Sequence, residues 1–177
     1  MASKDGKKFE SAIQNSAKYY NIYCERIKDS ASSFGQDSGF TKYTVKNPYD
    51  FFFFYNRAFF PSELKSTEMT SISIQREKKA KGKMIKLNQI EGLSKGIKHE
   101  YIFPHFLLDF RVTGNTYYLR IEDFLRFLND SEKKSINEKD VIEYGGFIVD
   151  KTLLRSNYRY YLSKVFDLQI KNYEGEK

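Results

Sequence analysis

The feature that most constrains this chain is a pair of short aromatic-rich runs separated by two polar residues. The stretch PYDFFFFYNRAFFPSELKST contains the runs 51–55 and 58–64, with Asn56 and Arg57 between them. Aromatic enrichment favours strands over helices, and a two-residue polar gap between such runs is typical of a β-hairpin. The sequence therefore predicts a hairpin. Because the first run is apolar throughout, we expect that strand to be covered on both faces.

Three charged residues lie at one end of this predicted hairpin. Asp50 comes directly before the first strand, and Glu63 and Lys65 lie two residues apart in the second. Antiparallel pairing brings Asp50 beside them, and the spacing places Glu63 and Lys65 on one face. Two carboxylates and the backbone carbonyl of Leu64 are oxygen ligands that suit Mg²⁺. On spacing alone, a surface ion pair between Lys65 and one acid is the simpler interpretation.

A magnesium ion at this position would have a chemical use. A bound divalent cation lowers the pKa of its water ligand and shields the charge that grows on a phosphate under attack. An ammonium beside the ion, that of Lys65, would orient the attacking water or stabilise the transition state. The same three residues are therefore candidates for phosphodiester hydrolysis.

The remaining pattern predicts an α/β fold, a mixed central β-sheet flanked by helices. Helices are expected at about 7–22, 84–97, 121–130, from 137 and at 157–168, and strands at 43–45, 51–55, 58–64, 101–111 and 115–120. The 177 residues fit one domain spanning 1–177. We expect flexible ends at 1–6 and 169–177. The small polar residues 29–41 indicate a loop.

The charge of the chain favours polyanionic partners. Lys and Arg number 30 against 23 Asp and Glu, a net charge of +7, which is typical of proteins that bind nucleic acid. A dense basic run lies between Arg76 and Lys86, and it can contact phosphates or form a solvated loop. Since it follows the acidic hairpin so closely, we favour contact with DNA. The candidate DNA-binding residues are Arg26, Lys28, Arg76, Lys78, Lys79, Lys81 and Lys83.

Other classes of protein are disfavoured. Cys24 is the single cysteine and cannot form an internal disulfide, which suits a reducing compartment. No apolar run approaches the roughly 20 residues of a membrane span, and the first residues have no secretory pattern. His99 and His105 have no partner at zinc-like spacing. We expect a protein of the cytoplasm, in a bacterial or phage-infected cell.

The order of these features resembles a known nuclease family. Asp50 followed by Glu63-Leu64-Lys65 on a helix-then-hairpin frame is similar to the core of the PD-(D/E)xK nuclease superfamily. GKKFESAIQNSAKYY resembles the first helix of RecU-type Holliday junction resolvases, AFFPSELKST their strand with E-x-K, and LNQIEGL their His-Gln helix. YIFPHFLLDF, NTYYLRIEDFLRFL and KKSINEKDVIE follow the remaining elements in order, so the resemblance spans about residues 6–168.

This resemblance implies a metal-dependent endonuclease that cuts four-way DNA junctions as a homodimer, in recombination, repair or phage genome processing. Asp50 and Glu63, with the Leu64 carbonyl, would hold Mg²⁺, or Mn²⁺ as a substitute. Lys65 would be the catalytic lysine. Glu10 would be an auxiliary acid near the metal, and Gln89 would orient a ligand or contact phosphate. The alternative for Glu10 is a carboxylate in the first turn that the helix dipole stabilises. The alternative for Gln89 is a polar helix residue exposed to solvent.

The chain departs from the family pattern in the segment between Tyr20 and Asp50. The resemblance places there a stalk that enters the junction, and here it is shorter and lacks basic and Pro-containing sequence; residues 29–41 stand in its place. Asn88 also replaces the histidine before Gln89. Two alternatives therefore stay open. One is a general or restriction-type nuclease on this fold, and the other is a non-catalytic DNA-binding module whose acid cluster is structural.

Overall fold

The computed structural model describes residues 4–27 and 47–175. Its helices are α1 Lys4–Tyr19, α2 Leu87–Ser94, α3 Ile121–Asp130, α4 Glu138–Glu143 and α5 Leu162–Gly175. Its strands are β1 Tyr23–Arg26, β2 Phe51–Tyr55, β3 Ala58–Thr67, β4 Ser71–Ser73, β5 His105–Phe110, β6 Asn115–Arg120, β7 Ser135–Asn137, β8 Phe147–Ile148, β9 Lys151–Leu153 and β10 Tyr158–Tyr160. Among these described residues, no helix is long and apolar enough to cross a membrane.

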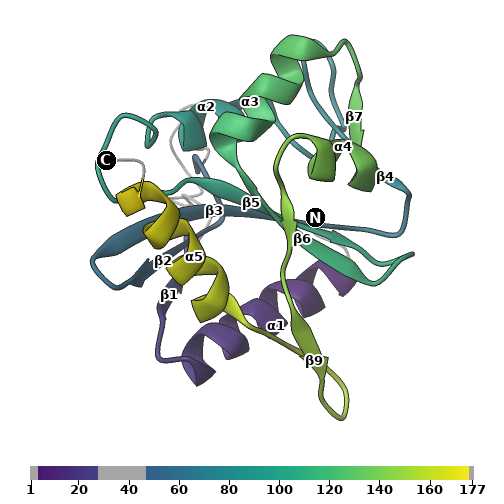
Figure 1. The fold of residues 1–177 in the computed structure, drawn as a ribbon. Helices are drawn as coiled ribbons and strands as arrows, with labels where there is room; N and C mark the ends of the chain where they lie inside the picture. Colours follow the sequence, from purple (N-terminus) through teal and green to yellow (C-terminus); the bar gives the residue numbers. More distant parts are fainter. Residues whose placement is uncertain (1–3, 28–46, 176–177) are drawn as a thin grey trace, which may run out of the picture.

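Six strands form the central sheet in the order β1-β2-β3-β5-β6-β8. Every pairing in it is antiparallel except that of β3 with β5, which run parallel from Ser62 opposite His105 to Thr67 opposite Phe110. A parallel pair needs a crossover, and the chain makes it through β4 and α2 (Figure 1). The predicted α/β fold with a mixed sheet flanked by helices is confirmed.

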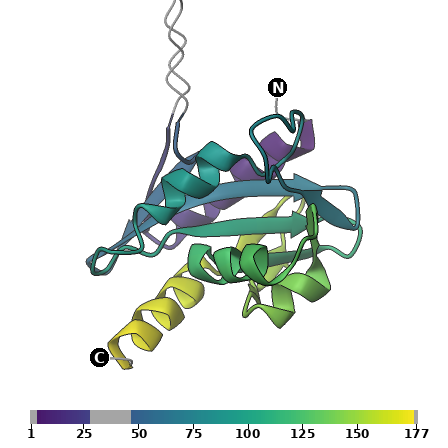
Figure 2. The same ribbon diagram turned by 90° about the horizontal axis from the view of Figure 1, so that it is seen from above.

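Helices cover both faces of this sheet. In Figure 1, α2, α3 and α4 lie above the sheet and α1 lies below it. Figure 2 shows α2 and α3 side by side over the upper face. Alternate residues of each strand point to opposite faces, so the buried side chains divide into two cores, one shared with α1 and α5 and the other with α2, α3 and α4.

The β2–β3 hairpin forms as predicted, with Asn56 and Arg57 as its turn. Both turn residues have positive φ, 45° and 66°, which is the backbone of a tight turn that matches strand twist. The expectation that β2 is covered on both faces is wrong, because Phe54 is 51% exposed. Among the described residues, the core beneath α2 and α3 contains no β2 residue.

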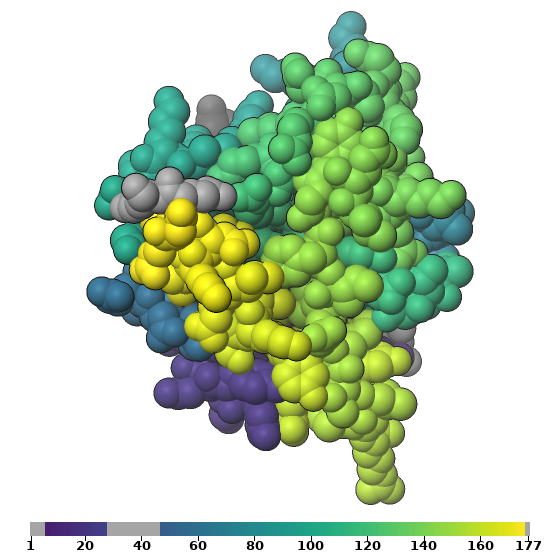
Figure 3. All heavy atoms as spheres, in the orientation of Figure 1, coloured from purple at the N-terminus to yellow at the C-terminus, as the bar shows by residue number. Residues whose placement is uncertain are grey.

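Several predicted boundaries are corrected by pairing between distant segments. The last helix begins at Leu162 rather than at 157, because residues 158–160 pair with 151–153 as a second hairpin. This hairpin projects from the lower edge of the molecule (Figure 3). The helix also continues to Gly175, where the Tyr173 ring packs against Tyr101 and Phe103. The tail expected to fray is therefore largely part of the fold.

Other predicted helix and strand boundaries also differ from the structure. Helix α2 begins at Leu87 rather than at 84, because Ile85 forms a bridge with Ile74. The strand predicted at 101–111 is shorter, and β1, β4, β7, β8, β9 and β10 were not predicted. The strand predicted at 43–45, the loop at 29–41 and Lys28 lie outside the described residues.

His105 is buried at the start of β5, in the core shared with α1. Its ring stacks on Tyr118 with centroids 4.3 Å apart, Nδ1 lies 3.0 Å from the Phe103 carbonyl oxygen, and Nε2 lies 2.9 Å from Ser62 Oγ. Burial lowers the pKa of the imidazole to about 3, although the hydrogen bond to Phe103 opposes this shift. The ring is therefore a neutral core group rather than a ligand for a cation.

We expect the His105 imidazole of the folded protein to stay neutral at pH 5. Because the unfolded chain takes up this proton near pH 6.5 and the folded chain does not, stability falls as pH decreases below that value. The chain has two histidines, so an NMR titration of the His99→Gln variant reports on His105 alone. A midpoint near 6.5 in the folded protein would contradict the buried, neutral ring.

Candidate active site

The structure brings Asp50, Glu63 and Lys65 together at the end of the β2–β3 hairpin. Pairing of β2 with β3 ends where Phe51 lies opposite Ser62, so Asp50 comes beside Glu63. The Asp50 backbone N–H donates to Glu63 Oε2 at 3.1 Å. The Lys65 ammonium donates to Glu63 Oε1. The convergence expected from strand alternation is therefore present in the fold.

Glu63 is fully buried at the centre of this cluster. Besides Lys65, the side-chain amide of Gln89 donates to its Oε1. Burial raises the pKa of the Glu63 carboxyl to about 8; Lys65 lowers it and the neighbouring Asp50 carboxylate raises it further. A buried carboxyl whose pKa is raised toward neutral beside a specific charge partner is a feature of functional sites more often than of plain surface ion pairs.

Gln89 links this carboxyl to the start of α2. Its Oε1 accepts the Lys86 backbone N–H at 3.0 Å, while its Nε2 faces Glu63. The side chain is buried, so the alternative of a solvated helix residue is wrong. Its Nε2 reaches Glu63 because the helix lies so close to the hairpin end.

Gly92 allows α2 to approach the segment before the hairpin closely. A Cβ on Gly92 would lie 2.4 Å from the Pro48 Cβ and 2.5 Å from the Pro48 carbonyl oxygen, and no side chain can be accommodated there without movement of backbone. Asn88 Nδ2 also donates to the Asn47 carbonyl at 3.3 Å. Helix α2 therefore packs directly on the segment that leads to Asp50. A glycine inside a helical pattern is a signal of such a close approach.

Glu10 of α1 contacts Arg26 of β1, the strand beside β2. Its carboxylate accepts from Arg26 Nε at 3.1 Å, and Arg26 pairs in register with Phe51, the residue after Asp50. Arg26 therefore connects Glu10 to the end of β2 that follows Asp50. Within the described part of the chain, no three His, Cys, Asp or Glu side chains are grouped closely enough to hold a metal ion. At the hairpin end, the carboxylates of Asp50 and Glu63 interact with each other.

Leu64, the residue expected to offer a carbonyl, lies in β3 just past its pairing with β2. From Glu63 onward β3 continues in register with β5 alone. Its side chain is buried in the core shared with α1, on the face opposite Glu63 and Lys65. The two carboxylates and the Leu64 backbone thus lie where the antiparallel pairing of β2 with β3 ends.

The basic residues divide into two groups. Arg76 is a structural residue: its guanidinium donates to the carbonyls of Leu128 at 2.9 Å and Lys133 at 2.7 Å, and also to that of Ser131. These carbonyls lie at the C-terminal end of α3, where a cation is favoured. The others lie in the loop that leads to α2: Lys78, Lys79 and Lys81 are exposed and Lys83 is half-buried.

This loop is tied to the candidate site through its ends. Ile74 and Ile85 form a bridge, and the backbone N–H of Ile85 donates to the Ser73 carbonyl at 3.0 Å. The chain then enters α2, which carries Gln89. Arg26, the remaining described candidate, is exposed and paired with Glu10.

Comparison with known proteins finds a prophage relative. The chain is 34% identical over 182 residues to the SPbeta prophage-derived uncharacterized protein YotM of Bacillus subtilis (strain 168), with 96% of this chain and 89% of the relative covered. The chain belongs to the same family as this prophage protein. No protein-family model matches the chain.

Removing the guanidinium of Arg76 is expected to destabilise the fold. Arg76→Ala leaves carbonyls at the end of α3 without their charged donor. Because Arg76 is half-buried, water can replace part of this interaction, so the net loss is of the order of one hydrogen bond to a charged group, about 1.5–3 kcal/mol. We expect a loss of about 2 kcal/mol in the free energy of unfolding, measured by urea denaturation. The matched control Lys79→Ala, on the exposed part of the same run, should change it by less than about 0.5 kcal/mol. Equal effects would contradict the structural role of Arg76.

The raised pKa of Glu63 predicts a particular dependence of stability on pH. Between its ordinary value of 4.5 and about 8, the folded chain holds a proton at Glu63 that the unfolded chain releases. This group therefore makes the wild type less stable as pH rises through that window. Glu63→Gln removes the contribution, so the stability of the variant relative to wild type should increase from pH 5 to pH 8.

Denaturation curves at several pH values would measure this difference. Glu91→Gln removes one exposed carboxylate from α2 and serves as the control for charge. If the wild-type and Glu63→Gln stabilities run parallel between pH 5 and pH 8, the protonated carboxyl is not a property of the folded protein.

Proposed function

We propose that this protein is a metal-dependent, structure-selective DNA endonuclease of the PD-(D/E)xK type, whose preferred substrate is a four-way junction. The observation that carries the proposal is the buried Glu63 carboxyl, held between Asp50, Lys65 and Gln89 at the end of a hairpin. The sequence resemblance to RecU-type resolvases includes the same four residues. The prophage origin of a family member supports a role in phage genome processing, in the cytoplasm of a bacterial cell.

The residues at this site fit a divalent cation. Two neighbouring carboxylates repel when both are ionised, and Asp50 contributes to the raised pKa of Glu63. A cation would favour the ionised form of both. Asp50 and Glu63, with the Leu64 carbonyl, would hold Mg²⁺ or Mn²⁺, which prefer oxygen ligands. When bound, the ion would supply an acidified water and charge stabilisation at the phosphate.

The side chains of the protein account for the rest of the chemistry. Gln89 orients the Glu63 carboxyl by donating to Oε1, with its own amide fixed by the Lys86 N–H. Lys65 carries its positive charge beside the same carboxyl and would stabilise charge that develops on the phosphate. The exposed Lys78, Lys79 and Lys81 would contact the DNA backbone.

A homodimer is part of this proposal. Two identical sites related by a two-fold axis would cut the two strands of a junction symmetrically.

A second candidate function has an observation in its favour. Glu63 is already satisfied by Lys65 and Gln89, as a buried structural ion pair would be. The protein would then be a DNA-binding module without catalysis. The two functions differ in whether the carboxylates take a metal and whether the phosphodiester is cut.

A gel assay with labelled four-way junction and matched linear duplex distinguishes these functions. We expect paired, symmetric nicks in the junction with Mg²⁺ or Mn²⁺ and none with EDTA. Asp50→Asn should reduce the rate by at least about 100-fold while junction binding persists. Asp130→Asn, at the exposed end of α3, is the matched control and should cut at the wild-type rate.

The other outcomes have definite meanings. Equal cutting of junction and duplex would indicate a general nuclease on this fold. Tight binding without cutting in either metal would establish the binding module. Mg²⁺ should also raise the melting temperature of wild type but not that of Asp50→Asn, which reports on metal binding independently of cleavage.

A further inference from the structure

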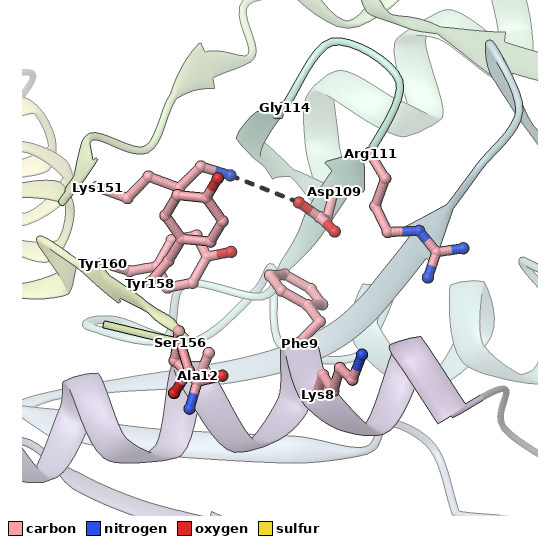
Figure 4. Close-up of a pocket in the computed structure, with 11 residues that line it drawn as sticks. Lys8, Phe9, Ala12, Asp109, Arg111, Gly114, Lys151, Ser156, Tyr158 and Tyr160 are labelled. Atoms are coloured by element: carbon pink, nitrogen blue, oxygen red, sulfur yellow. Dashed lines mark ion pairs between the residues drawn. The ribbon is translucent and has the colours of Figure 1, made fainter. Parts of the chain in front are cut away.

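A second polar site lies on the opposite face of the sheet from Glu63. Successive residues of β3 point to alternate faces, so Ser66 points away from the face that carries Lys65. There a pocket of about 320 Å³ opens beside α1 (Figure 4). Its lining comes from four separate parts of the chain: Lys8, Phe9 and Ala12 of α1; Asp109, Arg111 and Gly114 at and after the end of β5; Lys151 of β9; and Ser156, Asn157, Tyr158 and Tyr160.

The inner part of the pocket is a hydrogen-bonded network built on Asp109. This buried carboxylate accepts from Ser66 Oγ at 2.7 Å and from Thr116 Oγ1 at 2.9 Å. The Lys151 ammonium donates to Thr116 Oγ1 at 3.0 Å and lies 3.7 Å from Asp109. Burial lowers the pKa of Lys151, and Asp109 opposes that shift. A donor and an acceptor are thus fixed side by side at the inner end of the pocket.

Aromatic rings line one wall of the pocket. The Lys151 ammonium lies 4.5 Å from the centroid of the Tyr158 ring and 5.2 Å from that of Tyr160. Phe9 packs edge-on against Tyr160 with centroids 5.7 Å apart. Tyr160 is buried, whereas Tyr158 is 41% exposed. The Lys151 ammonium covers part of the Tyr158 ring face, and the exposed remainder of the ring offers an aromatic surface at the mouth of the pocket.

The charge of the lining favours an anion. Lys8, Arg111 and Lys151 are cationic and Asp109 is the one carboxylate among the lining residues, a net charge of +2. Arg111 pairs with Glu68 at 3.0 Å, and its planar guanidinium suits oxygen anions. In Figure 4, Lys8 extends from α1 toward the pocket, on the side away from the two tyrosines. Cations and stacking rings thus lie at different sides of one pocket.

We propose that this pocket binds a nucleoside monophosphate. The base would lie against the exposed part of the Tyr158 ring, with its polar edge toward the Lys151 ammonium and the Asp109 carboxylate, and the phosphate would lie toward Lys8 and Arg111. Proteins that bind single-stranded nucleic acid combine aromatic rings for the bases with cations for the phosphates, and this pocket offers both elements at the scale of one nucleotide. The volume is at the lower end of the range for small-molecule sites, which suits one nucleotide rather than two. The site goes beyond the endonuclease function and does not depend on it.

Calorimetric titration of the full-length chain with deoxyadenosine monophosphate and thymidine monophosphate tests the proposal. Deoxyadenosine and inorganic phosphate are the comparison ligands, since each supplies one half of the nucleotide. We expect a nucleotide to bind at least about tenfold more tightly than either half, because both parts of the pocket then contribute. Equal affinity for phosphate alone, or no binding of any nucleotide, would overturn the proposal.

Single substitutions test whether the nucleotide binds at this pocket. Lys151→Met keeps the length of the side chain and removes the donor, and should weaken nucleotide binding about tenfold. The control Lys164→Met, on an exposed lysine paired with Asp150, should leave affinity unchanged. Glu63→Gln should also leave it unchanged, so a failure of the endonuclease proposal would not be mistaken for a failure of this one.

An optical probe covers the case in which Lys151→Met fails to fold. The chain contains no tryptophan, so Tyr158→Trp provides a single tryptophan at the half-exposed mouth of the pocket, which is excited selectively at the red edge of the absorption band, where tyrosine does not absorb. Nucleotide should quench its emission with the same affinity that calorimetry gives. Tyr23→Trp, at an exposed tyrosine of β1, should not respond. Equal quenching of both variants would show that binding is not at the pocket.

Discussion

The arrangement at the hairpin end depends on the burial of one carboxyl group, that of Glu63. Removing a carboxylate from water costs several kcal/mol unless donors and cations compensate. Here the compensation comes from three directions: the Asp50 backbone, the Lys65 ammonium and the Gln89 amide. The raised pKa shows that this compensation is incomplete. The need to place those donors explains why the hairpin end and α2 must lie so close together.

Strand β3 organises both sites of the molecule because its residues alternate between faces. Glu63 and Lys65 point to the face covered by α2, while Ser66 points to the face covered by α1 and bonds to Asp109. The parallel register of β3 with β5 places Ser66 opposite Asp109. A single strand therefore carries the candidate active site on one side and a member of the pocket network on the other.

Agreement between sequence and structure is greatest where the determining contacts are local. The hairpin was predictable because its turn and its two strands are adjacent in sequence, and the same pairing places Asp50 beside Glu63. The last helix was misplaced because residues 158–160 pair with 151–153 instead of continuing the helical pattern. The basic run was read as one feature, yet Arg76 donates to the Leu128 carbonyl at the end of α3, 52 residues further along the chain. Charge density does not distinguish a solvated lysine from an arginine that caps the end of a helix.

The sequence by itself determined the hairpin, the shared face of Glu63 and Lys65, and the α/β class, because these follow from strand alternation and from short-range pairing. Only the tertiary structure decided that Gln89 reaches Glu63, that Gly92 allows α2 to lie on Pro48, and that Asp109 and Lys151 form one pocket. Each of these contacts joins segments that are distant in sequence. They depend on strand register and helix position, which arise when the whole core packs and which no local periodicity encodes.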